Sequence, residues 1–194
     1  VRYTYGGKGN LETAAGNGSF SSNDGFGNLG HGRIEQKYDA GLIAKFGKAL
    51  LTESKTVSDS GDGIAGSGTE KTNLDGSSQH QEVTVRYGYD ASAKLISAAG
   101  EGTFIGDDGY GNKSHGTIKQ SYVMINGQAK IGSSKTVTDS GDGIAGSQSE
   151  KTSLDGSSQR QEMTVFYSYD GNGRLKIGGN GNGTFHSNDG YGNL

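Results

Sequence analysis

An internal repeat of about 80 residues organises the chain. Three segments align with one another: VRYTYGGKGNLETAAGNGSF from Val1, VRYGYDASAKLISAAGEGTF from Val85 and VFYSYDGNGRLKIGGNGNGTF from Val165. Each continues into a related loop: SNDGFGN at 22–28, GDDGYGN at 106–112 and SNDGYGN at 187–193. The nonapeptide DSGDGIAGS occurs at 59–67 and again, unchanged, at 139–147. Such spacing indicates duplicated structural modules, which we place at 1–84, at 85–164 and, as a partial unit, at 165–194.

Alternation of apolar and polar residues with a period of two predicts β-strands within these units. The residues expected on one face of their strands are Val83, Val85, Tyr87 and Tyr89; Met163, Val165, Tyr167 and Tyr169; and Ile118, Gln120, Tyr122 and Met124. Asn-Gly pairs favour tight hairpin turns, and they occur at 17–18, 126–127 and 172–173. We therefore expect antiparallel strands joined by short turns.

The segment AGLIAKFGKALL at 40–51 is the one stretch compatible with a short helix. Its counterpart in the second unit, MINGQAKIG at 124–132, contains an Asn-Gly pair that disfavours a helix. Because the two segments occupy equivalent places in the repeat, we predict that both are strands.

The predicted fold class is all-β, built from tandem antiparallel β-repeat modules. Hydrophobic residues make up only 29% of the chain, so a single unit has little with which to fill a core of its own. Units of this kind bury apolar surface against their neighbours, which favours a solenoid-like stack or laterally paired sheets over independent sandwiches. Tyrosines supply most of the bulk, and we expect a structural role for Tyr3, Tyr5, Tyr87, Tyr89, Tyr167 and Tyr169.

The partial third unit stops at Leu194, which matches Leu29 in the middle of the first unit. We expect either that the chain is a window on a longer array or that another chain completes the unit. Head-to-tail contacts of the second kind build open filaments. Self-association with other copies or with neighbouring repeats is therefore the predicted partnership.

Composition removes several classes of function. The chain has no cysteine, which excludes disulfides, cysteine-ligated zinc and thiol catalysis. A net charge of −3 with interspersed signs does not provide the basic stripe of a nucleic-acid-binding protein. No apolar stretch is long enough for a transmembrane helix. We predict no enzyme activity, because an active site would have to exist in two nearly identical copies or lie between them.

The glycine- and aspartate-rich loops are the candidate cation sites. Carboxylates on such loops suit calcium, and the candidate ligands are Asp59, Asp62, Asp139 and Asp142. Their spacing is not that of an EF-hand, and Asp-Gly pairs also form ordinary turns, which is the interpretation we favour; no other cofactor is expected. The histidines, His31, His80, His115 and His186, do not show the spacing of a metal or catalytic motif.

The stretch YSYDGNGRL at 167–175 resembles the YD-repeat of Rhs-type and teneurin-type surface proteins. The pattern Tyr-x-Tyr-Asp-x-x-Gly-Arg-Leu is matched by Tyr167, Tyr169, Asp170, Gly173, Arg174 and Leu175. The counterpart YGYDASAKL at 87–95 keeps the two tyrosines, the aspartate and the leucine, whereas YTYGGKGNL at 3–11 has Gly6 in place of the aspartate. The resemblance covers about nine residues per unit. It implies a strip of β-hairpins in an extracellular or secreted shell, without catalysis by the repeat itself.

These observations favour a structural or adhesive segment of a repetitive bacterial surface protein, assembled into a filament, sheath or stalk outside the cell. Two alternatives stay open. The first is a β-module that binds glycans or another surface through exposed tyrosines, and the second is an Rhs-like encapsulating shell.

Overall fold

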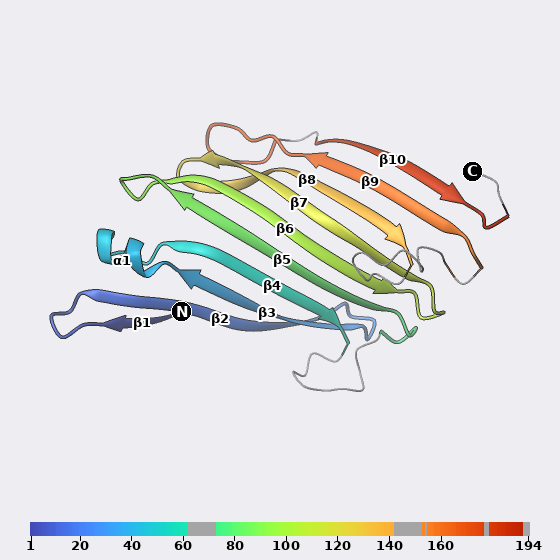
Figure 1. The fold of residues 1–194 in the computed structure, drawn as a ribbon, viewed down its shortest axis with the longest axis horizontal. Coiled ribbons are helices and arrows are strands. Elements are labelled where there is room, and N and C mark those ends of the chain that lie inside the picture. The colour runs from blue at the N-terminus through green and yellow to red at the C-terminus, as the bar shows by residue number, and fades with distance from the viewer. Residues whose placement is uncertain (62–72, 142–152, 154, 177–178, 192–194) are drawn as a thin grey trace.

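The computed structural model describes residues 1–61, 73–141, 153, 155–176 and 179–191, and these form one antiparallel sheet of ten strands. The strands lie side by side in the order of the sequence, so that each pairs with its neighbours in the chain (Figure 1). They are β1 Arg2–Tyr5, β2 Leu11–Asn23, β3 Leu29–Tyr38, β4 Leu51–Ser60, β5 Ser78–Tyr89, β6 Leu95–Asp107, β7 Lys113–Ile125, β8 Gln128–Ser140, β9 Ser158–Phe166 and β10 Asn180–Asn188.

The sheet is open, with β1 and β10 at its two edges (Figure 1). This confirms the expected antiparallel β-structure. Strands from all three sequence units join the same sheet, and no second sheet packs on it among the described residues. The division into units remains a prediction, and its boundaries at Val85 and Val165 fall inside β5 and β9 rather than between strands.

The strand predicted for 40–51 is wrong in its first part, because Ala40–Phe46 forms a short helix, α1. The Asp39 side chain caps its first turn by accepting a hydrogen bond from the Leu42 N–H at 2.8 Å. Gly47 ends the helix in the left-handed conformation, with φ of 64°. The helix contacts β2 and buries Ile43, which is 1% exposed. The two caps and the burial of Ile43 stabilise the helix. The segment therefore differs from its counterpart in the second unit.

The equivalent segment of the second unit is the β7–β8 hairpin, as predicted. Asn126 and Gly127 have φ values of 52° and 77°, the left-handed pair that a tight hairpin turn requires. The turn predicted at 17–18 is wrong, since both residues lie inside β2 and pair with β3. The pair at 172–173 does form a turn, with the Gly173 N–H donating to the Asp170 carbonyl oxygen at 3.0 Å.

The register separates the side chains of the sheet into two faces. We call one the apolar face; it carries Phe20, Ile34, Val83, Val85, Phe104, Ile118, Met163, Val165 and Phe185. The opposite face is the charged face, where most of the lysines, arginines and glutamates of the strands lie. Apart from the part of β2 next to α1, no described element covers the apolar face. The apolar residues are therefore half-buried among their neighbours or, as at Met163 and Phe185, exposed.

Large side chains on the apolar face lie opposite glycines of the next strand. Phe20 of β2 faces Gly32 of β3, and Phe104 of β6 faces Gly116 of β7. In both pairs a Cβ atom added to the glycine would lie 2.3 Å from the phenylalanine Cζ atom. The phenylalanine ring therefore covers the glycine backbone, an arrangement known to stabilise glycine in sheets.

Replacing one of these glycines tests this packing. In Gly32→Ala, the new methyl group must displace Phe20 and would also lie 2.4 Å from the Val57 carbonyl oxygen, so we expect a loss of about 2 kcal/mol in the free energy of unfolding. Gly18→Ala is the matched control in β2, because nothing lies within 4 Å of its added Cβ atom. Urea unfolding measures both variants, and an equal effect at the two positions would contradict the packing described here.

Candidate interaction surfaces

The tyrosines of the strands gather at the end of the sheet where α1 lies. Burial raises the pKa of the Tyr87 hydroxyl, and burial followed by the proximity of Tyr87 raises the pKa of Tyr122. Tyr89 donates its hydroxyl hydrogen to the carbonyl oxygen of Leu51, at 2.8 Å. These side chains are part of the packed surface of the sheet.

One tyrosine contact recurs at the repeat distance. Tyr169 donates to the carbonyl oxygen of Ile131 at 2.9 Å, and both residues lie 80 positions after Tyr89 and Leu51. The other predicted structural tyrosines differ more in their surroundings. Tyr3 and Tyr5 lie in the edge strand β1 and are 48% and 61% exposed, and the backbone N–H of Tyr167 donates to Gly132 just beyond β9.

Two of the four predicted calcium ligands, Asp59 and Asp139, lie among the described residues. Asp59 contacts His80, with 2.5 Å between Oδ1 and Nδ1, and Asp139 accepts from Arg160 at 3.0 Å. Asp62 and Asp142 lie outside the described residues. No three acidic or histidine side chains of the described part converge as metal ligands. Calcium binding therefore stays a prediction, and the two visible carboxylates are engaged in contacts with a neighbouring strand.

The first residues of the copied nonapeptide hold the β4–β5 and β8–β9 connections. The Ser60 Oγ atom accepts from the Gln79 N–H at 2.8 Å, and Ser140 does the same for Gln159 at 2.9 Å. Gly61 has a φ of 110°, a conformation that glycine adopts readily, and donates to the Leu29 carbonyl oxygen at 2.8 Å. Gly141 repeats this contact with Lys113. The identical letters thus make identical contacts at Ser60–Gly61 and Ser140–Gly141.

The Asp-Gly loops at the opposite end from α1, which we call the loop end, are internally hydrogen-bonded. Asp24 accepts from the N–H of Phe26, which is the main cause of its lowered pKa. In the next equivalent loop, Asp108 accepts chiefly from the Asn112 side chain, which likewise lowers its pKa. These carboxylates therefore act as acceptors that fix the turn.

Each of these loops presents one aromatic side chain to solvent. Phe26, Tyr110 and Tyr191 occupy the same position in the three loops and are 85%, 80% and 88% exposed. The sequence prediction did not single out these residues. The signal was present, because each loop contains an Asp-Gly-aromatic triplet at the repeat spacing.

Two polar grooves accompany these loops. They have volumes of about 410 and 350 Å³. The first is lined in part by Asp24, Asn28 and Gln81, and the second by the equivalent residues Asp108, Asn112 and Gln161. The grooves offer carboxylate and amide groups beside the loops that carry Phe26 and Tyr110.

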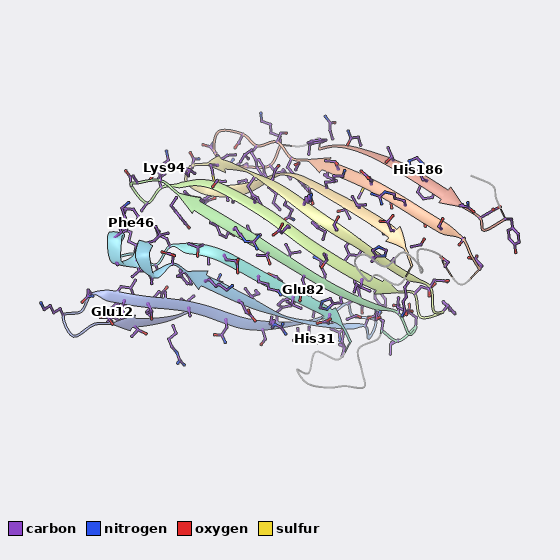
Figure 2. The ribbon with its side chains drawn as sticks, viewed as in Figure 1. Glu12, His31, Phe46, Glu82, Lys94 and His186 are labelled. Atoms are coloured by element: carbon purple, nitrogen blue, oxygen red, sulfur yellow. The ribbon has the colours of Figure 1, made fainter. Side chains whose placement is uncertain are left out.

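The histidines lie in one row across the charged face. The pairing register places His31 opposite Asp59, His80 opposite Asp59 from the other side, and His115 opposite Asp139. His186 on β10 continues the row opposite Arg160, and Figure 2 shows His31 and His186 on strands at opposite sides of the sheet. Within the described residues, the buried Nδ1 atoms of His31 and His115 make no hydrogen bond.

Ion pairs connect neighbouring strands on the charged face. They join Lys37 to Glu53 at 2.7 Å, Lys55 to Glu82 at 2.8 Å, Lys135 to Glu162 at 2.7 Å and Arg86 to Glu101. The lysine hydrogen bond is in each case the main cause that lowers the pKa of its partner glutamate. These pairs are solvent-accessible and screened by water, so they contribute little to stability, and their main effect is to favour one strand register.

Comparison with protein-family models, with curated proteins and with solved structures found no match to this chain. In the described residues, no helix has the length and apolar character that a membrane-crossing helix needs.

The glutamate pairs predict a loss of stability in acid. Since the folded-state pKa values of Glu53, Glu82 and Glu162 lie below the ordinary value of 4.5, the stabilisation is present at neutral pH and is lost as the pH falls through those lowered values. We expect the urea midpoint to fall between pH 5 and about pH 3. The variant with Glu82→Gln and Glu162→Gln should show a shallower fall. The same pH dependence in both proteins would contradict this assignment.

Proposed function

We propose that this chain is a structural β-module that extends its sheet laterally with further copies of its own repeat. The observation that supports this proposal most directly is the open edge at each side of a single-layer sheet. β2 pairs with β1 only from Leu11 to Ala15, whereas its equivalent β6 is paired along its length with β5. Among the described residues, positions that are paired inside the sheet thus have no partner strand at its edges.

The composition of the outer strand also supports lateral addition. Edge strands that avoid pairing usually carry lysines, prolines or other charged groups. Between Asn180 and Asn188, β10 contains no lysine, arginine, aspartate, glutamate or proline. The apolar face adds a further surface that copies can cover when they assemble, since Met163 is 46% exposed and Phe185 is 56% exposed.

The module we propose belongs to an extracellular filament, sheath or stalk on a bacterial surface. The resemblance of 167–175 to YD-repeats supports that setting. An Rhs-like shell would use the same lateral growth but would close around a cargo.

Assembly of the purified chain tests the proposal. We expect light scattering and negative-stain electron microscopy to show ribbons or filaments that form as the protein concentration rises. Thr184→Lys places a charge on the edge strand β10 and should raise the concentration needed for assembly about tenfold, which corresponds to about 1.4 kcal/mol.

Thr103→Lys is the matched control for this experiment. Thr103 lies opposite Glu82 in the internal strand β6, as Thr184 lies opposite Glu162 in β10, and the substitution should leave assembly unchanged. Dispersed monomers at every concentration would refute the proposed function. Equal effects of the two lysines would refute the role of the β10 edge.

Glycan binding is a second candidate function, and the exposed aromatics of the loop end favour it. Phe26 and Tyr110 are exposed and belong to the loops that line the two grooves through Asp24 and Asp108. Aromatic faces combined with amide and carboxylate groups are suited to sugar rings. The tyrosines of the strands fit this role less well, because Tyr87 and Tyr89 belong to the packed surface of the sheet.

Pull-down with insoluble cellulose, chitin and peptidoglycan tests this second function. We expect retention of the wild-type chain on at least one of these polymers and loss of retention in the triple variant Phe26→Ala, Tyr110→Ala, Tyr191→Ala. The fold should survive, because all three rings are largely exposed, and circular dichroism checks this. No retention on any polymer, or equal retention of the triple variant, would exclude this use of the loop aromatics.

A further inference from the structure

The centre of the apolar face carries no charged residue. The pairing register aligns residues in rows that cross the sheet from β2 to β10, and three successive rows of the apolar face pass through Val85, Val83 and Gln81 of β5. These rows consist of glycine, serine, threonine, glutamine, isoleucine, valine, methionine and phenylalanine alone. The two rows between them on the charged face contain Arg33, Glu35, Lys55, Glu82, Glu101, Lys119, Lys135 and Glu162. A partner that covers the apolar face must therefore itself be neutral.

Large and small residues alternate from strand to strand in two of these rows. The row through Val83 consists of Gly18, Ile34, Thr56, Val83, Gly102, Ile118, Thr136, Met163 and Gly183. In this row and in the row through Val85, β3, β5, β7 and β9 carry isoleucine, valine, methionine or glutamine, whereas the strands between and beside them carry glycine, serine or threonine. The face thus has ridges separated by furrows, and the pattern repeats every two strands, or about 9.5 Å.

The ridges are open to a partner from above. Helix α1 packs against β2 at one side of the sheet and leaves the ridges on β5, β7 and β9 without a covering element among the described residues (Figure 1). Met163 on the β9 ridge is 46% exposed. Towards the loop end the ridges stop at the third row, where the large residues Phe20, Phe104 and Phe185 lie on β2, β6 and β10.

The exposed area of the chain is large enough to supply a stable interface. The chain exposes 12327 Å², whereas a compact monomer of 20.1 kDa exposes about 8,700 Å² on the usual scaling of area with mass. Each partner in a stable homodimer contributes about 1,000–2,500 Å². The excess, about 3,600 Å², is shared by both faces and the loops, and the apolar face has to provide only about a third of it to reach that range.

We propose that two copies of this chain pack with their apolar faces together and form a two-layered sandwich. The second copy fits this face because its ridges have the same spacing as the furrows they enter. A shift of one strand places each ridge of one sheet over a furrow of the other, and side chains of facing sheets interdigitate in this way in β-sandwiches. Such a contact is isologous and closes at two copies. It uses the face of the sheet rather than its edges, so it does not depend on the lateral growth proposed above.

A charge in a central furrow tests the contact. Thr136→Lys places an ammonium group on the apolar face, opposite Ile118, whereas Thr117→Lys places the same group on the charged face of the neighbouring strand, opposite Val137. Sedimentation velocity, below the concentration at which larger assemblies form, should show a wild-type dimer. We expect Thr136→Lys to raise its dissociation constant about tenfold or more, which corresponds to about 1.4 kcal/mol, and Thr117→Lys to leave it unchanged.

A milder pair of variants locates the interface without a buried charge. The chain has no cysteine of its own, so Thr136→Cys and Thr117→Cys each introduce a single thiol on a known face. Alkylation by iodoacetamide is measured across a dilution series that spans the dimer dissociation constant. We expect the Thr136→Cys thiol to react at least about tenfold more slowly in the dimer than in the monomer, and the Thr117→Cys thiol to react at one rate throughout.

The outcomes separate this inference from the proposed function. A monomer at every concentration overturns the inference, because the face then belongs to an occupant other than a second copy. A dimer or a ribbon in which the Thr136→Cys thiol stays fully reactive also overturns it and assigns association to the edges, as the proposed function requires. Protection of Thr136→Cys in a dimer that never forms ribbons sustains the inference, and only the proposed function falls.

Discussion

The contact between a large side chain and a glycine of the next strand is the interaction on which this sheet depends. A sheet of one layer encloses little, and among the described residues the buried hydrophobic side chains are Ala14, Ile43 and Val57. Apolar surface is removed from water chiefly between neighbouring strands, where Phe20 and Phe104 cover glycine backbone. This explains why a chain with 37 glycines and few hydrophobic residues can hold long strands: its glycines are half of a packing pair rather than gaps in a core.

The charged face complements this arrangement through register. Val57 lies between Arg33 and Glu82 and is 4% exposed, so the long polar side chains of neighbouring strands cover it with their aliphatic parts. Exposed ion pairs contribute little to stability. A slip of one residue, however, would transfer every side chain to the opposite face and would separate Lys55 from Glu82 and Lys135 from Glu162. The two faces thus select the same alignment by different means.

The sequence predicts the strands well and their surroundings poorly. Alternation identified the common face of Val83, Val85 and Tyr87, and the Asn-Gly pair at 126–127 identified a hairpin. The turn prediction failed at 17–18 because the pairing of Gly18 with Ile34 and of Phe20 with Gly32 continues β2 through the Asn-Gly pair. The strand prediction failed at 40–46 because it gave the helix-capping residues Asp39 and Gly47 less weight than the equivalence with the second repeat unit. The partners of Asp59 and Asp139 depend on strand register, which the sequence pattern does not reveal. The exposure of the loop aromatics depends in the same way on loop conformation.

The two edges of the described sheet are not equivalent. β1 is four residues long and carries Arg2, and it leaves Gly16–Asn23 of β2 without a neighbour among the described residues. β10 is nine residues long and contains no lysine, arginine, aspartate or glutamate, and no described strand lies on its outer side. A long neutral edge pairs readily with another strand, whereas a short charged strand provides few backbone groups to an incoming partner. β10 repeats the Gly-x-Gly-x-Phe pattern of β2 and β6, so the described edge carries the same alternation of small and large side chains that is paired with β3 and β7 inside the sheet.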